Sequence, residues 1–183
     1  VLLTHGHYDH TGGIDDLRPF SAFGSVELFM EEKLEQVIRE RMPYCFGPIR
    51  YGGVPDITIR RINEINSFFV DTVEVIPIRV MHYKLPILGY RIGDFVYLTD
   101  VKTIPEREWE KLKNVDTLVI SALRRKEHIS HQTLQQALEV VDIIGPKRAF
   151  FTHMSHEMGL HEEIQRELPS HVMFAYDGQE LTL

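Results

Sequence analysis

The sequence has very little cysteine: Cys45 is the only one among 183 residues. One thiol excludes a framework of internal disulfides and suits a reducing compartment, so we expect a cytoplasmic protein. The sequence also lacks an apolar run approaching the roughly 18 residues that cross a bilayer. No basic segment followed by an apolar one opens the chain, and we therefore expect neither a signal peptide nor a membrane partner.

The sequence also has fewer basic than acidic residues. Lysine and arginine number 20 against 27 aspartates and glutamates, which gives a net charge of -7 with neutral histidines. Proteins that coat nucleic acid usually carry the opposite sign, so the charge argues against a nucleic-acid partner. The hydrophobic fraction of 43% and the charged fraction of 26% are ordinary for a folded protein. The length predicts one domain spanning residues 1–183.

Apolar residues recur with two different periods along the chain. The period of a strand is expected over 25–30, 56–62, 68–80, 88–100, 116–123, 148–153 and 172–183. The period of a helix is expected over 31–42, 105–114, 130–145 and 159–168. Early strands followed by alternating strands and helices predict a layered α/β architecture.

Residues that commonly bind metals are most closely spaced in the opening segment, VLLTHGHYDHTGG. Successive residues of a strand face opposite sides, so ligands this closely spaced must lie on a loop just past a strand. There His5 and His7 can face one point, and Asp9 and His10 can face a second. Imidazole and carboxylate without cysteine are typical ligands of a hydrolytic Zn, Mn or Fe site rather than a structural one.

The glycines after this motif also fit a metal loop. Gly12 and Gly13 would let the backbone turn closely around the ions into a following helix. A histidine-rich surface loop is the competing interpretation. In a chain of this composition the pattern HxHxDH arises by chance on the order of one time in 600, which favours the metal interpretation.

HxHxDH is the signature of the metallo-β-lactamase-fold hydrolases, and the chain resembles that superfamily throughout. Three more residues match its ligands: His82 in IRVMHYKLPILGY, Asp100 in FVYLTD and His153 in RAFFTHMSH. Each follows a predicted strand. The resemblance implies an α/β fold built as a four-layer αββα sandwich, in which these strand ends would meet.

The same resemblance implies two divalent metal ions, Zn or Mn. It assigns one ion to His5, His7 and His82, the other to Asp9, His10 and His153, and the bridging position to Asp100. Two cations about 3.5–4 Å apart lower the pKa of a shared water, so that a bridging hydroxide is available near neutral pH. Asp9 therefore counts among the catalytic residues as well as among the ligands.

Longer segments resemble one subfamily, the phosphoribosyl 1,2-cyclic phosphate phosphodiesterases. They are HYKLPILGYRIGDFVYLTD, SALRRKEHISHQTLQQALEVV, FFTHMSHEMGLHEE and AYDG. This resemblance implies a phosphodiesterase acting on a small cyclic phosphate ester. His131 matches a catalytic histidine that protonates the leaving oxygen, and His128 competes for that role. Arg124, Arg125 and Lys126 could attract an anionic substrate, but we expect them to form mainly a solvated loop.

In that subfamily His156 matches a ligand of an additional structural zinc, which cysteines near the N-terminus complete. The chain has no such cysteines, and Cys45 lies in a different region, where we expect a half-buried thiol. The sequence therefore argues against a third ion.

Other functions of the same fold stay open. A tRNA 3′-processing endonuclease shares the ligands, but the interval between His82 and Asp100 is too short for its usual substrate-binding arm. A thioester or lactone hydrolase is a third alternative. An inactive metal-binding fragment is an alternative of another class.

The resemblance also predicts a departure at the start of the chain. Family members carry several strands before HxHxDH, whereas here the motif begins at His5. We therefore expect the N-terminal strands of the first sheet to be lacking, with residues 1–3 as a central strand. An unpaired edge beside it would favour association into a homo-oligomer.

Overall fold

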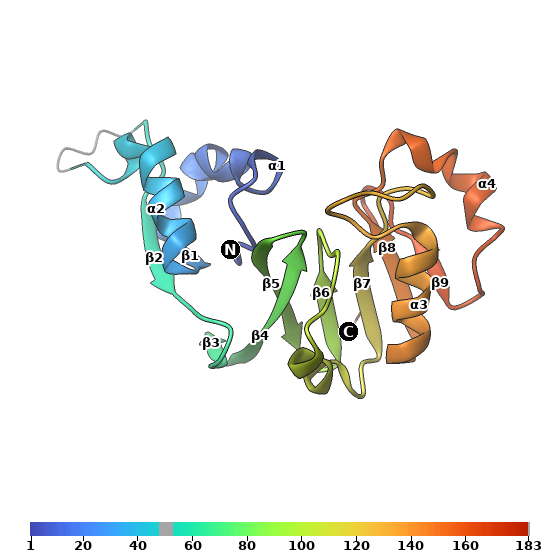
Figure 1. Cartoon of the computed structure of the whole chain (residues 1–183). Helices are drawn as coiled ribbons and strands as arrows, with labels where there is room; N and C mark the ends of the chain where they lie inside the picture. Colours follow the sequence, from blue (N-terminus) through green and yellow to red (C-terminus); the bar gives the residue numbers. More distant parts are fainter. Residues whose placement is uncertain (48–52, 183) are drawn as a thin grey trace. The chain divides into compact units, whose positions relative to one another are not determined.

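The computed structural model describes residues 1–47 and 53–182, drawn in Figure 1. Its contacts divide the chain into two compact units, Val1–Asn66 and Ser67–Leu183, and each is described by itself. The predicted single domain over 1–183 stays a prediction. Within the described part of the chain, every helix is too short or too polar to span a membrane.

The first unit is built on two parallel strands. β1 (Val26–Met30) pairs with β2 (Ile57–Arg61), and the helix α2 (Glu32–Arg41) connects them with the 3-10 turn η2 (Pro43–Cys45). Residues 1–3, predicted as a central strand, form only an isolated bridge between Leu2 and Phe29. Leu3 N donates to the Phe29 carbonyl at 3.0 Å and Phe29 N donates to the Val1 carbonyl at 2.9 Å, so this segment pairs with β1 as predicted but over one residue pair rather than a full strand.

α2 packs one apolar face onto this sheet, as its period predicted. Leu34 and Ile38 are buried, and Cys45 is fully buried rather than half-buried. Glu35 is buried too, and its carboxylate accepts hydrogen bonds from Arg61 Nε at 2.6 Å and Arg39 Nε at 2.7 Å. The bond from Arg61 is the main reason that the pKa of Glu35 lies below its usual value. The buried charge is thus paired, and it ties α2 to β2.

The histidine-rich segment continues into helical turns. α1 (Tyr8–Thr11) leads directly into the 3-10 helix η1 (Gly12–Phe23). Gly12 has a right-handed φ of -61°, so no special turn needs it. A Cβ at Gly12 would instead lie 2.9 Å from Cε1 of Tyr8. The glycine therefore makes room for the Tyr8 ring, which corrects our expectation that it serves a backbone turn.

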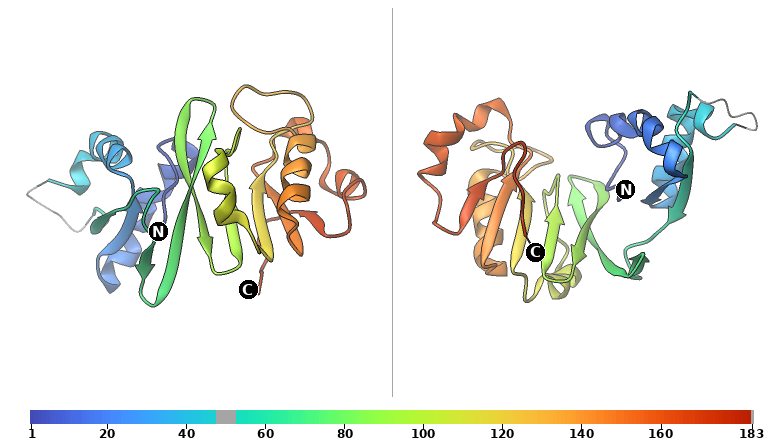
Figure 2. Two further views of the ribbon diagram at one scale, coloured as in Figure 1. Left: turned by 60° about the horizontal axis from the view of Figure 1, so that its bottom comes forward. Right: turned by 180° about the vertical axis from the view of Figure 1, so that it is seen from behind.

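The second unit contains a seven-stranded mixed sheet with the strands in chain order, seen from two further sides in Figure 2. Its strands are β3 (Phe68–Val70), β4 (Val73–His82), β5 (Leu85–Ile92), β6 (Phe95–Leu98), β7 (Thr117–Ser121), β8 (Arg148–Thr152) and β9 (Val172–Phe174). The pairs from β3 to β6 are antiparallel, and those from β6 to β9 are parallel. The predicted strands over 68–80, 88–100, 116–123 and 148–153 all fall in this sheet.

Strand direction places three predicted ligands at one edge. Because β4 and β6 are both antiparallel to β5, they run in the same direction as β7 and β8. The carboxyl ends of β4, β6, β7 and β8 therefore lie at the same edge of the sheet. His82 ends β4, Asp100 lies two residues past β6, and His153 follows β8 directly.

α3 (Leu134–Ile144) and the 3-10 helix η3 (Glu106–Leu112) cover one face of this sheet (Figures 1 and 2). Thr133 and Gln136 form a capping box at the start of α3, and Gly145 ends it in a left-handed conformation with φ 65°. The helix begins four residues later than the period predicted, because the capping box fixes its start.

Three other predicted elements are shorter or tighter than expected. The helix expected over 105–114 is the 3-10 helix η3, and that over 159–168 is only α4 (His161–Gln165). Of the strands expected over 172–183, the described residues up to 182 contain β9, after which the chain turns at Gly178 with a φ of 81°; residue 183 lies outside the described residues. The turn η4 (His156–Met158) precedes α4.

We predict that Gly89→Ala destabilises the second unit. A Cβ at Gly89 would lie 2.8 Å from the carbonyl oxygen of Tyr97 and would also clash with the Leu98 side chain. Overpacking of this kind costs about 1–3 kcal/mol of unfolding free energy. Urea titration measures it. Gly13→Ala, where nothing lies within 4 Å of the new Cβ, should change stability by less than about 1 kcal/mol. Equal effects at the two positions would contradict the packing argument.

Candidate metal centre

His82 and Asp100 are joined at the carboxyl edge of the second unit. Both are buried, and His82 Nδ1 lies 3.0 Å from the backbone carbonyl oxygen of Asp100. Because a carbonyl only accepts, Nδ1 carries the proton and the lone pair is on Nε2. A ring oriented by a carbonyl in this way is the usual state of a metal-binding histidine.

Asp100 and His153 share an uncommon backbone conformation. Their φ values are 56° and 57°, in the left-handed region that few non-glycine residues adopt. His153 Nε2 lies 3.5 Å from Oδ1 of Asp100, and the same oxygen accepts a hydrogen bond from Thr99 Oγ1 at 2.7 Å. Left-handed residues cluster at functional sites, because their cost must be supported by the surroundings.

His131 completes this cluster from the loop between β7 and α3. Its side chain is buried, and its ring centroid lies 4.5 Å from that of His82 and 5.2 Å from that of His153. It precedes the helix cap, so it is not a residue of the first turn. Burial lowers the pKa of His131 to about 4, against the opposing effect of Asp100. At pH 7 the ring is therefore neutral in the protein alone.

The second unit by itself offers a set of donors that fits a cation. One ligand atom each from His82, Asp100 and His131 lies within 4.8 Å of the other two, and all three residues are buried. The buried Nδ1 of His131 has no hydrogen-bond partner among the described residues. Converging imidazole and carboxylate groups of this kind suit Zn or Mn rather than a structural zinc held by thiolates.

The first unit gathers its own ligand candidates in the opening loop. His5 Nε2 lies 2.9 Å from His7 Nδ1, and the centroids of the His5 and His10 rings are 4.4 Å apart. Asp9 and His10 approach each other to 3.3 Å. Thr4 Oγ1 lies 3.0 Å from His5 Nδ1, which orients that ring. The predicted local pairs, His5 with His7 and Asp9 with His10, are therefore both present.

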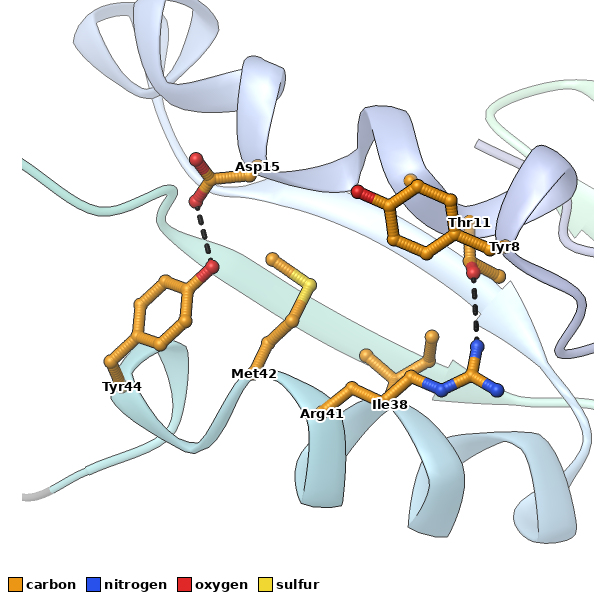
Figure 3. Close-up of a pocket in the computed structure, with 8 residues that line it drawn as sticks. Tyr8, Thr11, Asp15, Ile38, Arg41, Met42 and Tyr44 are labelled. Atoms are coloured by element: carbon orange, nitrogen blue, oxygen red, sulfur yellow. Dashed lines mark hydrogen bonds between the residues drawn. The ribbon is translucent and has the colours of Figure 1, made fainter.

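The other face of α1 borders a cavity of about 200 Å³, shown in Figure 3. Arg41 reaches from α2 toward this loop, and its guanidinium donates to the carbonyl oxygen of Gly6 and lies 3.5 Å from Thr11 Oγ1. Thr11 in turn donates to the carbonyl oxygen of His7 at 2.9 Å. Across the cavity Tyr44 donates to Asp15 at 2.9 Å. The bonds from Arg41 and Thr11 therefore hold the backbone of the histidine-rich segment at Gly6 and His7.

The loop 123–133 is mainly solvated over its basic segment, as the sequence indicated: Arg125 and Lys126 are exposed, and Arg124 is half-buried. Arg124 donates to the Glu157 carboxylate and to the carbonyl oxygen of Glu127, and Arg125 donates to Glu167. Both arginines therefore hold the loop through ion pairs while the segment stays mainly solvated, as predicted. His128 is half-buried with its ring centroid 5.0 Å from that of His131.

His156, in contrast, is exposed and belongs to no metal-type cluster of the described residues. Sequence reasoning missed Thr4, Thr99 and Lys102, which support the candidate ligands. For the two threonines the available signal was position, since each directly precedes a candidate ligand. The joining of the two ligand sets into one dinuclear centre stays a prediction, because they lie in different units.

Comparison with known proteins gives a match over most of the chain. Residues 1–154 match the family described as the beta-lactamase superfamily domain. A crystal structure of a diphosphatase from the PhnP family is 34% identical, with a TM-score of 0.90, and the match covers 100% of this chain and 70% of that one.

Two further relatives match the chain less completely, one in length and the other in sequence identity. A protein of Porphyromonas gingivalis (strain ATCC BAA-308 / W83) named octanoyltransferase is 42% identical over 98% of this chain, which spans only 37% of that protein's length. The short form of human tRNase Z is 22% identical with a TM-score of 0.71, over 97% of this chain and 76% of that one. At that identity the likeness shows the fold alone.

Proposed function

Because this chain belongs to the beta-lactamase superfamily and has its metallo-β-lactamase fold, we propose that it is a metal-dependent hydrolase of phosphate esters. The observation that carries the proposal is the match to the PhnP-family diphosphatase, which extends over the whole chain. The buried ligand candidates His82 and Asp100, which lie within hydrogen-bond distance of each other at 3.0 Å, support it from the chain's own residues. We propose a small cyclic phosphodiester as substrate and a diphosphate as the alternative that the relative suggests.

We propose that His5, His7 and His82 hold one divalent ion, that Asp9, His10 and His153 hold a second, and that Asp100 bridges them. When bound, such ions supply Lewis acidity that activates water and neutralises charge building up on phosphate oxygens. The Thr99 hydroxyl holds one Asp100 oxygen at 2.7 Å, and the Asp100 carbonyl keeps the His82 proton on Nδ1. The protein thereby fixes the orientation of both ligands before any ion arrives.

His131 has two proposed roles in the reaction. As a proton donor it would protonate the leaving oxygen. With a pKa of about 4 only roughly one ring in 10³ is protonated at pH 7, so a neutral ring that donates a hydrogen bond is the alternative. The two roles differ in how strongly they depend on the basicity of the leaving group.

Two other functions find less support. In a tRNA 3′-processing endonuclease the substrate arm would lie between His82 and Asp100, but here β5, β6 and tight turns fill that interval. Acyl transfer is suggested only by the name of the longer relative. Acyl transfer through a thiol would need an accessible cysteine, whereas Cys45 is fully buried. Acyl hydrolysis by a bound metal would not need a thiol, so we include an octanoyl thioester among the test substrates.

A single substrate panel separates these functions. Protein loaded with Zn or Mn should hydrolyse a ribose cyclic phosphate or a diphosphate, and bis-p-nitrophenyl phosphate as a chromogenic substrate. It should leave a lactone, an octanoyl thioester and a precursor tRNA unchanged. Preferential cleavage of the thioester or lactone would contradict the proposal. Full metal loading with no turnover of any substrate would favour an inactive metal-binding fragment.

Elemental analysis tests the metal assignment. We predict close to two divalent ions per chain after loading, and a loss at both positions in Asp100→Ala, because a bridging carboxylate offsets the repulsion between two cations. Asp142→Ala, which removes an exposed carboxylate of α3, should keep both ions. A wild-type value near zero would exclude the dinuclear centre.

The proton-donor role predicts a specific kinetic pattern for His131→Ala. Metal content should stay unchanged while kcat falls by roughly 10²–10⁴-fold. The loss should be smaller for p-nitrophenolate, a leaving group that needs little protonation. His171→Ala, at a loop histidine of the same unit, provides the control. An equal loss for all leaving groups would assign His131 to binding, and a loss of metal would make it a ligand.

A further inference from the structure

Lys102 lies two residues past Asp100, and its side chain points into the protein. The ammonium lies 3.2 Å from the backbone carbonyl oxygen of His131, 3.1 Å from a carboxylate oxygen of Glu127 and 3.4 Å from Oε1 of Gln136. Only 20% of the Lys102 side chain is exposed. One lysine thus joins the edge that carries Asp100 to the loop that carries His131.

The number of donors decides what this lysine does. An ammonium group has three N–H donors and no acceptor. Lys102 has three protein acceptors within 3.4 Å, so its donors are directed to the protein rather than to a bound anion. The exposed Glu127 carboxylate also balances its charge. These contacts favour a role in holding the loop over a role in binding phosphate.

The backbone around Lys102 reaches the other side of the cluster. Lys102 N donates to the carbonyl oxygen of Met81 at 2.7 Å, directly before His82 in the chain. The neighbouring carbonyl of Val101 accepts from Gln132 N at 2.8 Å, directly after His131. The segment 100–102 therefore contacts both histidine-bearing segments, one through the backbone and the other through the backbone and the lysine.

We propose that Lys102 is a positioning residue that fixes His131 relative to His82 and Asp100, an inference that rests on the proposed role of His131. The buried His131 ring lies beside the rings of His82, His128 and His153, and its Nδ1 has no hydrogen-bond partner among the described residues. With no hydrogen bond at Nδ1, the position of the ring depends strongly on where its backbone is held. Lys102 holds that backbone at the carbonyl of His131 itself.

Hydrogen exchange measured by mass spectrometry tests the positioning without any need for activity. In Lys102→Met, amides of the loop 123–133 should exchange on the order of 10-fold faster, because the loop loses its central anchor. Lys111→Met is a matched control. Lys111 is 25% exposed and also bonds a carbonyl and a carboxylate, of Pro77 and Glu108. It should leave the loop unchanged. Equal exchange in wild type and Lys102→Met would overturn the proposal.

A second variant keeps the test decisive if Lys102→Met does not fold. Glu127 is 72% exposed, so Glu127→Ala removes one partner of Lys102 with little effect on the core. It should raise exchange in the same loop, by less than Lys102→Met. Unchanged exchange in this variant would contradict the proposal when Lys102→Met is unfolded.

A double-mutant cycle links the position of the loop to the chemistry. Lys102→Met alone should lower kcat by roughly 10-fold, with KM and metal content nearly unchanged. In the His131→Ala background the same change should cost less than about 2-fold, because Lys102 acts through His131. Full additivity would overturn the proposal. A wild-type protein without turnover would contradict the proposed function instead, and exchange would still decide the role of Lys102.

Discussion

The common direction of β4, β6, β7 and β8 is the constraint on which the second unit's cluster depends. It places His82, Asp100 and His153 at one carboxyl edge without any contact between their side chains being needed. Local bonds then refine the arrangement. The carbonyl of Asp100 sets the tautomer of His82, and left-handed φ values direct Asp100 and His153. Strand direction brings these residues to one edge of the sheet, and the local backbone conformation sets the orientation of their side chains.

Much of this arrangement could be predicted because it depends on periodicity. Apolar alternation identified the strands of the second sheet, and a ligand just after a strand end is placed by the strand itself. The environment of His131 could not be predicted in this way, because its burial depends on how loop 123–133 is held. Lys102 bonds the carbonyl of His131, and within the loop Arg124 bonds the carbonyl of Glu127. The role of Gly12 was missed for a similar reason, since it depends on where one tyrosine ring lies.

The negative net charge of the chain requires a local source of positive charge if the substrate is a phosphate ester. The chain carries a net charge of -7, which opposes the approach of an anionic phosphate ester. Arg124, Arg125 and Lys102 are engaged with Glu157, Glu167 and Glu127, so these cations are largely balanced within the protein. In our account bound divalent ions supply the positive charge at the site that attracts the substrate. Metal binding would then provide both the attraction and the chemistry.

Anomalous X-ray scattering from crystals of the zinc- or manganese-loaded protein tests the central claim most directly, because it locates the ions and identifies the element. We predict two peaks about 3.5–4 Å apart, with Asp100 between them and histidines of both units around them. One peak coordinated by His82, Asp100 and His131 alone would contradict the account, since His131 would then be a ligand and the opening loop would have no metal.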